Sequence, residues 1–203
     1  MLRWVVVVVF LGQAAAADPV AQVEAAAQAA FDRMPSVRRV DQIAGLCGAD
    51  DSVNAVVAYC TTTNQILLVR GAVPAPQTPY MLAHVYGHAV QVQHGVADFA
   101  LGQIRQRRVE EAMLRGLVTR QVDCIAGFLL ARAGLPAFNL QDAFADEPFT
   151  DSHWGRDPLR VGPEVSIGIA ARAEWLARGQ QDGLAACGPG EFTADLLIDA
   201  LNP

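Results

Sequence analysis

Two histidines stand four residues apart in the run YMLAHVYGHAVQVQHG, which extends from Tyr80 to Gly95. The run is apolar and predicts a helix, and residues four apart lie on one helix face, one turn from each other. His84 and His88 can therefore direct imidazole nitrogens at a single ion, as the histidines of an H-E-x-x-H zinc site do. In such a site the glutamate after the first histidine takes a proton from the metal-bound water. Val85 stands at that position and has no proton to exchange.

The spacing of His84 and His88 alone is a weak signal for metal. Two polar residues on a half-buried helix would give the same pattern, so both interpretations stay open. His94 follows His84 by ten residues, which is the spacing of the third ligand in H-E-x-x-H-x-x-G-x-x-H enzymes. That motif needs a glycine seven residues after the first histidine, and Gln91 stands there. We therefore expect His94 to lie at the surface, away from His84.

The first residues have the features of an export signal. Arg3 gives a basic start, residues 4–11 form an apolar core, and residues 14–17 supply small side chains for cleavage. We expect cleavage after residue 17 and a single domain over residues 18–203, with an uncleaved N-terminal anchor as the alternative. No later stretch reaches 18 uninterrupted apolar residues, so the mature chain is not expected to span a membrane.

Four cysteines in an exported chain predict two disulfides. Four cysteines allow three pairings, and the sequence does not choose among them. Cys47 and Cys60 flank a short segment and would close a local loop, which would leave Cys124 to pair with Cys187. Free thiols and a metal role are the alternatives, although the chain has no CxxC pair.

The charge distribution bears on the class of partner. The formal net charge is −6, and all 15 basic residues are arginines. The densest basic stretch is the short RQRR of residues 105–108. Without a longer basic stripe, nucleic acid is not an expected partner.

Hydrophobic periodicity and turn residues divide the mature chain into helices and one hairpin. VVAYC and QILLV are rich in β-forming residues and are separated by TTTN, which predicts a hairpin of residues 56–60 and 65–69. Thr78 is expected to cap the histidine helix. The fold class is therefore α+β, mostly helical with a small antiparallel sheet. The other predicted helices cover residues 20–33, 104–133, 165–178 and 192–201.

Four blocks of the chain resemble the bacterial neutral zinc metallopeptidases. The run HVYGHAVQ, from His84 to Gln91, with Gly95 after it, is similar to that family's H-E-x-G-H-H-V-Q helix. VVAYC with the following ILLV is similar to its F-Y-C-P segment and next strand. RQVDCIAG is similar to its E-L-Q-A-D-C-x-A-G, and RAEWLARGQQDGLAAC to its Q-R-V-x-W-F-x-x-G followed by a cysteine. The blocks keep the family's order and cover most of the mature chain.

The resemblance implies a zincin-like fold with zinc as its cofactor. It also implies an edge strand near residues 56–60 that binds an extended substrate backbone by strand addition. His84 and His88 match the first two metal ligands of the family. Asp123 matches an aspartate that orients a ligand histidine from behind.

Two parts of the implied machinery are missing. The general base of the family corresponds to Val85, and its third metal ligand, a glutamate, corresponds to Thr119. Loss of the base alone is expected to lower the rate of hydrolysis by about 10²–10⁴-fold. The remaining residues would hold zinc weakly, so bound zinc is itself in doubt.

Three functions stay open on the sequence. The favoured one is an exported metallopeptidase homologue that no longer cuts peptides and binds an extended peptide or another exported protein, or acts structurally. The second is an active zinc peptidase with an unrecognised third ligand and base. Asp123 could shift inward to bind the metal, or Thr119 could hydrogen-bond a metal-bound water, but neither change restores a base. The third is a structural or interaction protein without metal, in which His84 hydrogen-bonds to Asp123. The signal, the cysteines and the resemblance together predict a bacterial periplasmic or secreted protein.

Overall fold

The computed structural model describes residues 18–48, 56–149 and 165–202. Within them the chain is mostly helical and has one three-stranded sheet, which confirms the α+β class. The expected export signal lies outside the described residues. The longer helices are α1 (Pro19–Ala30), α2 (Thr78–Gln93), α3 (Val96–Gln106), α4 (Glu111–Arg132) and α6 (Ile169–Asp182), and the short ones are α5 (Leu140–Ala143) and α7 (Asp195–Asp199). Single 3-10 turns lie at Arg70–Ala72, Arg108–Glu110 and Leu184–Ala186.

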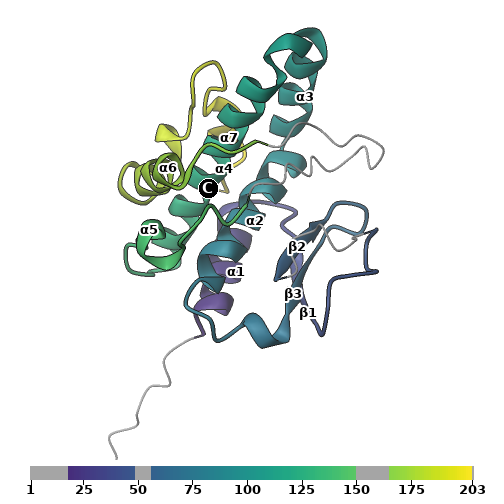
Figure 1. Ribbon diagram of the computed structural model, residues 1–203, viewed down its shortest axis with the longest axis vertical. Helices are drawn as coiled ribbons and strands as arrows, with labels where there is room; N and C mark the ends of the chain where they lie inside the picture. The colour runs from purple at the N-terminus through teal and green to yellow at the C-terminus, as the bar shows by residue number, and fades with distance from the viewer. Residues whose placement is uncertain (1–17, 49–55, 150–164, 203) are drawn as a thin grey trace, which may run out of the picture.

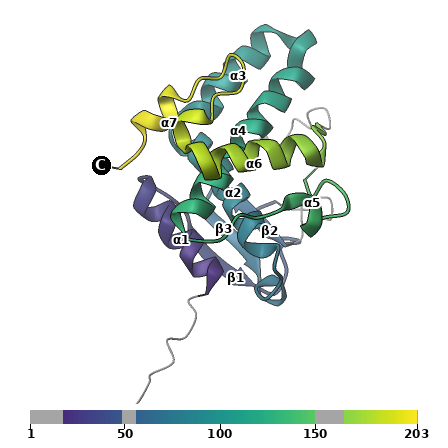
Figure 2. The same cartoon turned by 90° about the vertical axis from the view of Figure 1, so that its left-hand side faces the viewer.

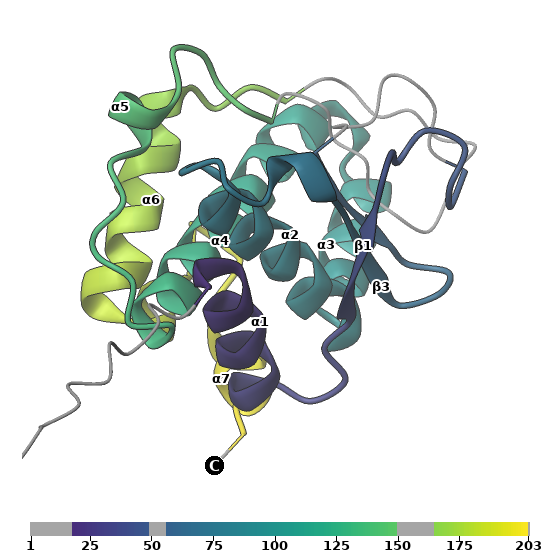
Figure 3. The ribbon, with the colours of Figure 1, turned by 90° about the horizontal axis from the view of Figure 1, so that it is seen from below.

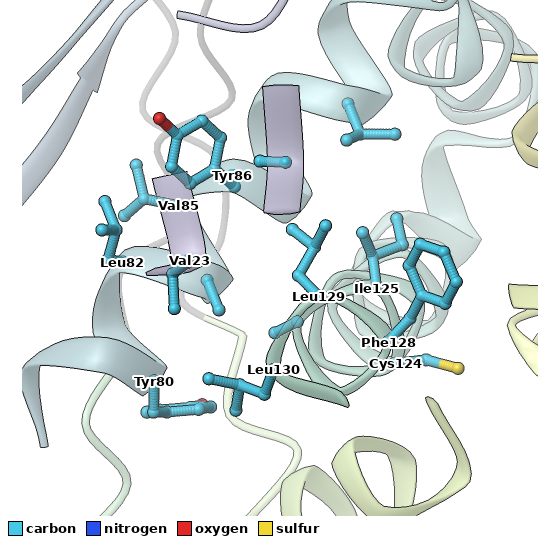
Figure 4. Close-up of a cluster of buried hydrophobic side chains, with 14 of the residues drawn as sticks. Val23, Tyr80, Leu82, Val85, Tyr86, Cys124, Ile125, Phe128, Leu129 and Leu130 are labelled. Carbon is cyan, nitrogen blue, oxygen red and sulfur yellow. The ribbon is translucent and has the colours of Figure 1, made fainter. Parts of the chain in front are cut away.

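Helices α2 and α4 form the centre of the molecule (Figure 1). The sheet lies against α2 on one side, and α6 packs along α4 on the other, as the view from below shows (Figure 3). Figure 2 shows α6 running across α4, with α1 and the sheet below them. Side chains from α1, α2 and α4 share one buried core (Figure 4), to which Trp175 and Leu176 of α6 also belong. None of the helices in the described ranges is long and apolar enough to cross a membrane.

The sheet contains the expected hairpin and one strand that was not expected. Strands β2 (Val57–Cys60) and β3 (Gln65–Val69) pair antiparallel across the TTTN turn, which confirms the hairpin. Strand β1 (Ser36–Val40) pairs parallel to the other side of β3, so the sheet is mixed and its order is β1-β3-β2. The sequence SVRRV does not alternate apolar and polar residues, because Arg38 and Arg39 are both exposed. Residues 36–40 therefore form a strand because they hydrogen-bond to β3, although their own sequence pattern does not predict one.

Glycines let the central helices approach closely. A Cβ added to Gly87 of α2 would lie 2.8 Å from the carbonyl oxygen of Val122 on α4. At the crossing of α4 and α6, a Cβ on Gly127 would lie 2.0 Å from the Leu176 oxygen. A Cβ on Gly179 would lie 1.8 Å from the Cys124 oxygen. These positions tolerate no side chain while the backbones stay in contact.

The last long helix, α6, ends later than expected. The helix was expected to end at residue 178, but α6 passes through Gly179 to Asp182 and ends at Gly183, where φ is +75°. Gly179 therefore serves helix packing, whereas the helix ends at Gly183, whose positive φ is a conformation that glycine adopts readily. The expected start at residue 165 is also wrong, since α6 begins at Ile169.

The helix expected over residues 104–133 is two helices. The chain leaves the helical conformation at Arg107 and turns back between α3 and α4. This hairpin brings Ile104 against Leu114 in a small cluster that also contains Phe192. In one straight helix, Ile104 and Leu114 would stand about 15 Å apart along the axis. Tertiary packing therefore determines where the helix breaks, since no proline or glycine stands at residues 105–111.

Three smaller expectations also need correction. Thr78 does not cap α2, because it is the first residue of the helix and its hydroxyl donates to the carbonyl oxygen of Ala72. Helix α1 stops at Ala30 instead of residue 33, since the following residue, Phe31, bridges to Leu201 near the C-terminus. The terminal helix of residues 192–201 is present as the shorter α7.

Both disulfides that the local-loop argument favoured are formed. Cys47 pairs with Cys60, and Cys124 pairs with Cys187. The first joins the segment after β1 to the last residue of β2, and the second joins α4 to the loop after α6. Disulfides of this kind fit a protein of an oxidising, extracytoplasmic compartment.

Candidate functional site

The candidate site lies on the face of α2 that turns toward α4. Tyr80, His84 and His88 are spaced by four residues, so their side chains form a row along this face. The ring centroids of Tyr80 and His84 are 6.0 Å apart, and those of His84 and His88 are 5.0 Å apart. The apolar residues on the rest of α2 fix the direction of the row, because they are buried in the core.

Asp123 of α4 is the acceptor that meets this row. Its Oδ1 atom lies 2.8 Å from Nδ1 of His84 and accepts a hydrogen bond of 2.9 Å from the hydroxyl of Tyr80. Its Oδ2 atom accepts a hydrogen bond of 2.9 Å from Nη1 of Arg172, which comes from α6. Asp123 and Arg172 are almost completely buried, and each side chain is exposed by 2% or less. One carboxylate thus ties together α2, α4 and α6.

Glu147 completes the network on the far side of Arg172. Its Oε1 atom accepts a hydrogen bond of 2.5 Å from Nε of Arg172. The same carboxylate accepts the N–H groups of Ile167 and Gly168, which precede the first turn of α6. A carboxylate at this place satisfies N–H groups that have no partner within the helix. Glu147 therefore holds the start of α6 and the charge of Arg172 together.

The protonation states follow from burial and charge. Burial alone would raise the pKa of Asp123, but the Arg172 guanidinium and the hydrogen bond from His84 outweigh it and hold this pKa below its ordinary value. Burial lowers the pKa of His84, although Asp123 opposes the shift, so the ring is neutral near pH 7. An ionised carboxylate only accepts hydrogen bonds, so Nδ1 of His84 carries the ring proton. The Nε2 atom then holds the free lone pair, which is the form that a metal ligand needs.

Aromatic rings enclose His84 and Tyr80. The ring of Phe149 stacks on His84 with centroids 4.0 Å apart and planes 7° from parallel. Phe138 stacks on Tyr80 at 5.5 Å. Burial together with the neighbouring His84 imidazole lowers the pKa of His88 to about 3, so this ring is neutral as well. The surroundings favour two neutral imidazoles over two charged ones.

Val85, which the resemblance aligns with the general base of the metallopeptidases, lies in the hydrophobic core. It is 6% exposed and belongs to the buried cluster that contains Val23, Leu82 and Tyr86 (Figure 4). A carboxylate at this position would enter apolar surroundings unless the helix moved. Val85 therefore takes part in packing.

Thr119, which the resemblance aligns with the third ligand, lies on the side of α4 that packs against α2. Helices α2 and α4 run antiparallel, since Gly87 meets Val122 and Gln91 donates to the oxygen of Val118. The turn of α4 that carries Thr119 therefore faces the turn of α2 that carries His88. The Thr119 hydroxyl donates to the carbonyl oxygen of Arg115 in its own helix, at 3.1 Å.

These residues do not fit a catalytic zinc. Such a site needs three protein ligands and an open position, and the described residues bring only His84 and His88 together. Asp123 cannot serve as the third ligand without breaking its bonds, because both of its oxygens are engaged on the network side. The inward shift of Asp123 that the sequence left open is thus opposed by its contacts. Among residues 18–48, 56–149 and 165–202, no three His, Cys, Asp or Glu side chains are grouped as a metal centre.

His94 lies apart from the histidine row, but it is only partly exposed. It follows the last turn of α2 and is half-buried, with its ring 5.8 Å from that of Phe31. It lines a surface pocket of about 510 Å³ together with Arg33, Asp98 and Asp199. The His94 ring thus contacts Phe31 after α1, and the chain turns into α3 at the next residue, Gly95, where φ is +80°.

Sequence reasoning missed four members of the site: Tyr80, Glu147, Phe149 and Arg172. Arg172 opens the C-terminal block RAEWLARGQQDG that resembles the metallopeptidases, and this block was the one signal that pointed to it. Glu147 and Phe149 stand in a polar, turn-rich stretch with no local pattern. Their roles depend on contacts with α6 and α2 that no spacing along the chain reveals.

Chemically, the site offers two neutral imidazoles next to the buried, hydrogen-bonded ion pair of Asp123 and Arg172.

A scan against protein-family models, a search of curated proteins and a search of solved structures each find no match to this chain.

Proposed function

We propose that this chain is an exported, zincin-like protein that does not hydrolyse peptide bonds and instead binds an extended peptide along strand β2. The resemblance of four sequence blocks to zinc metallopeptidases supports the zincin-like part of this proposal. The loss of hydrolysis follows from the chemistry of the residues at the base and third-ligand positions.

The observation that carries the proposal is the place of Val85 in the buried core. Hydrolysis assisted by a metal needs an ionisable group beside the attacking water. The position that supplies this group in the H-E-x-x-H motif is filled by an apolar side chain that packs with Leu82 and Tyr86. The nearest carboxylate on α4, Asp123, is held by three hydrogen bonds and is kept ionised by Arg172.

Peptide binding is supported by the position of β2 in the sheet. With the order β1-β3-β2, strand β2 has β3 on one side and forms the edge that lies toward α2. In an antiparallel ladder every second residue turns its N–H and C=O away from the partner strand. Val56 accepts from Val69, so the Val57 groups point away from β3. An extended segment can add to such an edge by main-chain hydrogen bonds.

One observation favours the alternative of an active zinc peptidase. The hydrogen bond to Asp123 fixes His84 in the tautomer that leaves Nε2 free to bind a metal, as ligand histidines in zinc sites are fixed. In that case the third ligand and the base would have to come from outside the residues described.

Both functions are tested with one probe, fluorescein-labelled denatured casein. The proposal expects a rise in anisotropy on binding and no cleavage, with or without added zinc. Amide hydrogen exchange provides the internal control, because β1 and β2 are both edge strands. Bound casein should slow exchange in residues 57–60 and leave residues 36–40 unchanged. Cleavage that a chelator abolishes would replace the proposal with the alternative, and protection of β1 instead of β2 would refute the binding edge.

A further inference from the structure

The two disulfides differ in their access to solvent. Cys124 and Cys187 are completely buried between α4 and the loop after α6. Cys47 is exposed, while its partner Cys60 is only 3% exposed at the end of β2. A thiolate in solution can therefore approach the first bond from the side of Cys47, and it cannot reach the second while the protein is folded.

A hydroxyl stands beside the exposed disulfide. The Thr62 Oγ1 atom lies 3.2 Å from the sulfur of Cys60 and 3.6 Å from the sulfur of Cys47. Thr62 belongs to the turn between β2 and β3, so the hairpin itself fixes the hydroxyl at this place. A hydroxyl donor at a cysteine sulfur stabilises the thiolate form of that cysteine, because a hydrogen bond to a charged acceptor is stronger than one to a neutral acceptor. Attack at the exposed Cys47 makes Cys60 the sulfur that departs, and the Thr62 hydroxyl lies closer to that sulfur.

We propose that the Cys47–Cys60 disulfide is a site of thiol–disulfide exchange, with Cys47 as the sulfur that is attacked and Thr62 as the group that stabilises the departing Cys60. The attacking thiolate forms a bond to Cys47 Sγ, and the electron pair of the broken S–S bond leaves with Cys60. A second thiolate attacks the reagent's own sulfur in this mixed disulfide and releases Cys47. Two protons are taken up, the cystine gains two electrons, and the reagent thiols are oxidised to a disulfide.

The exchange acts on a defined part of the fold. The segment after β1 contributes Ile43 and Leu46 to a small apolar cluster with Leu67 of β3. The disulfide ties this segment to the last residue of β2, which pairs with Gln65. Reduction therefore frees the segment from the end of β2 and leaves the main core, with its own disulfide, intact. This inference stands independently of whether β2 binds a peptide.

The test uses the purified, fully oxidised chain under native conditions. It is incubated with reduced glutathione in one arm and with dithiothreitol in the other, then quenched with a thiol-alkylating reagent and mapped by fragmentation mass spectrometry. Cys47 and Cys60 should be labelled while Cys124 and Cys187 stay paired, and the glutathione adduct should sit on Cys47. Equal reduction of the two disulfides, or an adduct on Cys60, would overturn the proposal.

Matched variants of the turn test the role of the hydroxyl. Thr62→Val removes the hydroxyl and keeps the shape, so it should slow reduction several-fold in both arms. Thr63→Val makes the same change at the neighbouring exposed position and should leave the rate unchanged. Equal rates in wild type and Thr62→Val would remove Thr62 from the mechanism. Circular dichroism and the unfolding midpoint of each oxidised variant show that a change in rate does not come from unfolding.

Discussion

The Nδ1 atom of His84 lies 2.8 Å from Oδ1 of Asp123, and both side chains are buried. The pair joins the helix that carries the histidine row to the helix that carries the opposing carboxylate. Because Oδ2 of the same carboxylate binds Arg172, the orientation of His84 depends on a charge that comes from a third helix. The site and the stability of the helical core are therefore coupled through Asp123.

Asp123→Asn should destabilise the protein strongly. The variant keeps the shape of the side chain but removes the charge that balances Arg172 in the interior, and breaking a buried ion pair costs about 3–5 kcal/mol. Urea denaturation followed by circular dichroism measures the free energy of unfolding. The matched control is Asp146→Asn at an exposed position, which should change it by less than about 0.5 kcal/mol. A loss below about 1 kcal/mol in Asp123→Asn would show that Glu147 alone balances Arg172.

Gly127→Ala should be among the most damaging of conservative changes. The added methyl would lie 2.0 Å from the Leu176 carbonyl oxygen, so α4 and α6 must move apart. Overpacking of this kind costs about 1–3 kcal/mol or more. Gly102→Ala on α3 is the control, since a Cβ there meets nothing within 4 Å. Alanine should stabilise that helix by up to about 1 kcal/mol, so the two variants should shift the thermal midpoint in opposite directions.

The comparison of these two glycines shows what sequence can and cannot predict. Gly127 belongs to a block that resembles the metallopeptidases, but the sequence does not show why a glycine is needed there. The need comes from the crossing with α6, whose residues lie about fifty positions further along the chain. The hairpin of β2 and β3 was predictable, because its signals are local: β-forming residues on both sides of a short polar turn. The break between α3 and α4 was not, because it follows from the contact of Ile104 with Leu114.

The candidate site likewise contains residues that the sequence predicted and residues that it did not. His84, His88 and Asp123 were found from spacing and resemblance, and the bond between His84 and Asp123 is present in the structure. Arg172 and Glu147 were not assigned, because a buried ion pair between distant elements leaves no periodic signal in either. The burial of Val85 could not be inferred from the motif either, since it depends on how α2 packs into the core.

The free energy of unfolding should fall as the pH drops below about 6.5. The pKa of His88 is lowered to about 3 in the folded protein, while the unfolded chain takes up its proton near the ordinary value of 6.5. The unfolded state therefore binds more protons between these two values, and stability is lost as the pH decreases through this window. Between pH 7.5 and 5.0 one such histidine contributes no more than about 2 kcal/mol.

Urea titrations at these two pH values, with a chelator present, measure the effect of protonation on stability. His88→Gln removes the titrating group and should reduce the difference between pH 7.5 and 5.0. His94→Gln is the control for a histidine outside the row, and it should retain the His88 contribution. A difference that is unchanged in His88→Gln would assign the pH dependence to other groups.

Thr119→Glu should raise the affinity of the site for zinc, because the antiparallel packing of α2 and α4 turns the helical turn of this position toward the turn that carries His88. A carboxylate there would give the two imidazoles a third protein ligand, the number that zinc sites with an open position use. Thr119→Gln has nearly the same size without the charge and is the matched control. Competition with a chromogenic chelator measures the zinc affinity of wild type and both variants.

The gain should vanish in Thr119→Glu combined with His88→Ala, because the third ligand acts only together with the histidine row. Val85→Glu should behave differently from Thr119→Glu. Its carboxylate enters the core around Leu82 and Tyr86, so it should lower the free energy of unfolding by at least about 2 kcal/mol. The combination of Val85→Glu and Thr119→Glu should keep the zinc gain at reduced stability. Equal zinc affinity in wild type, Thr119→Glu and Thr119→Gln would show that α4 does not face the histidine row as a ligand-bearing helix must.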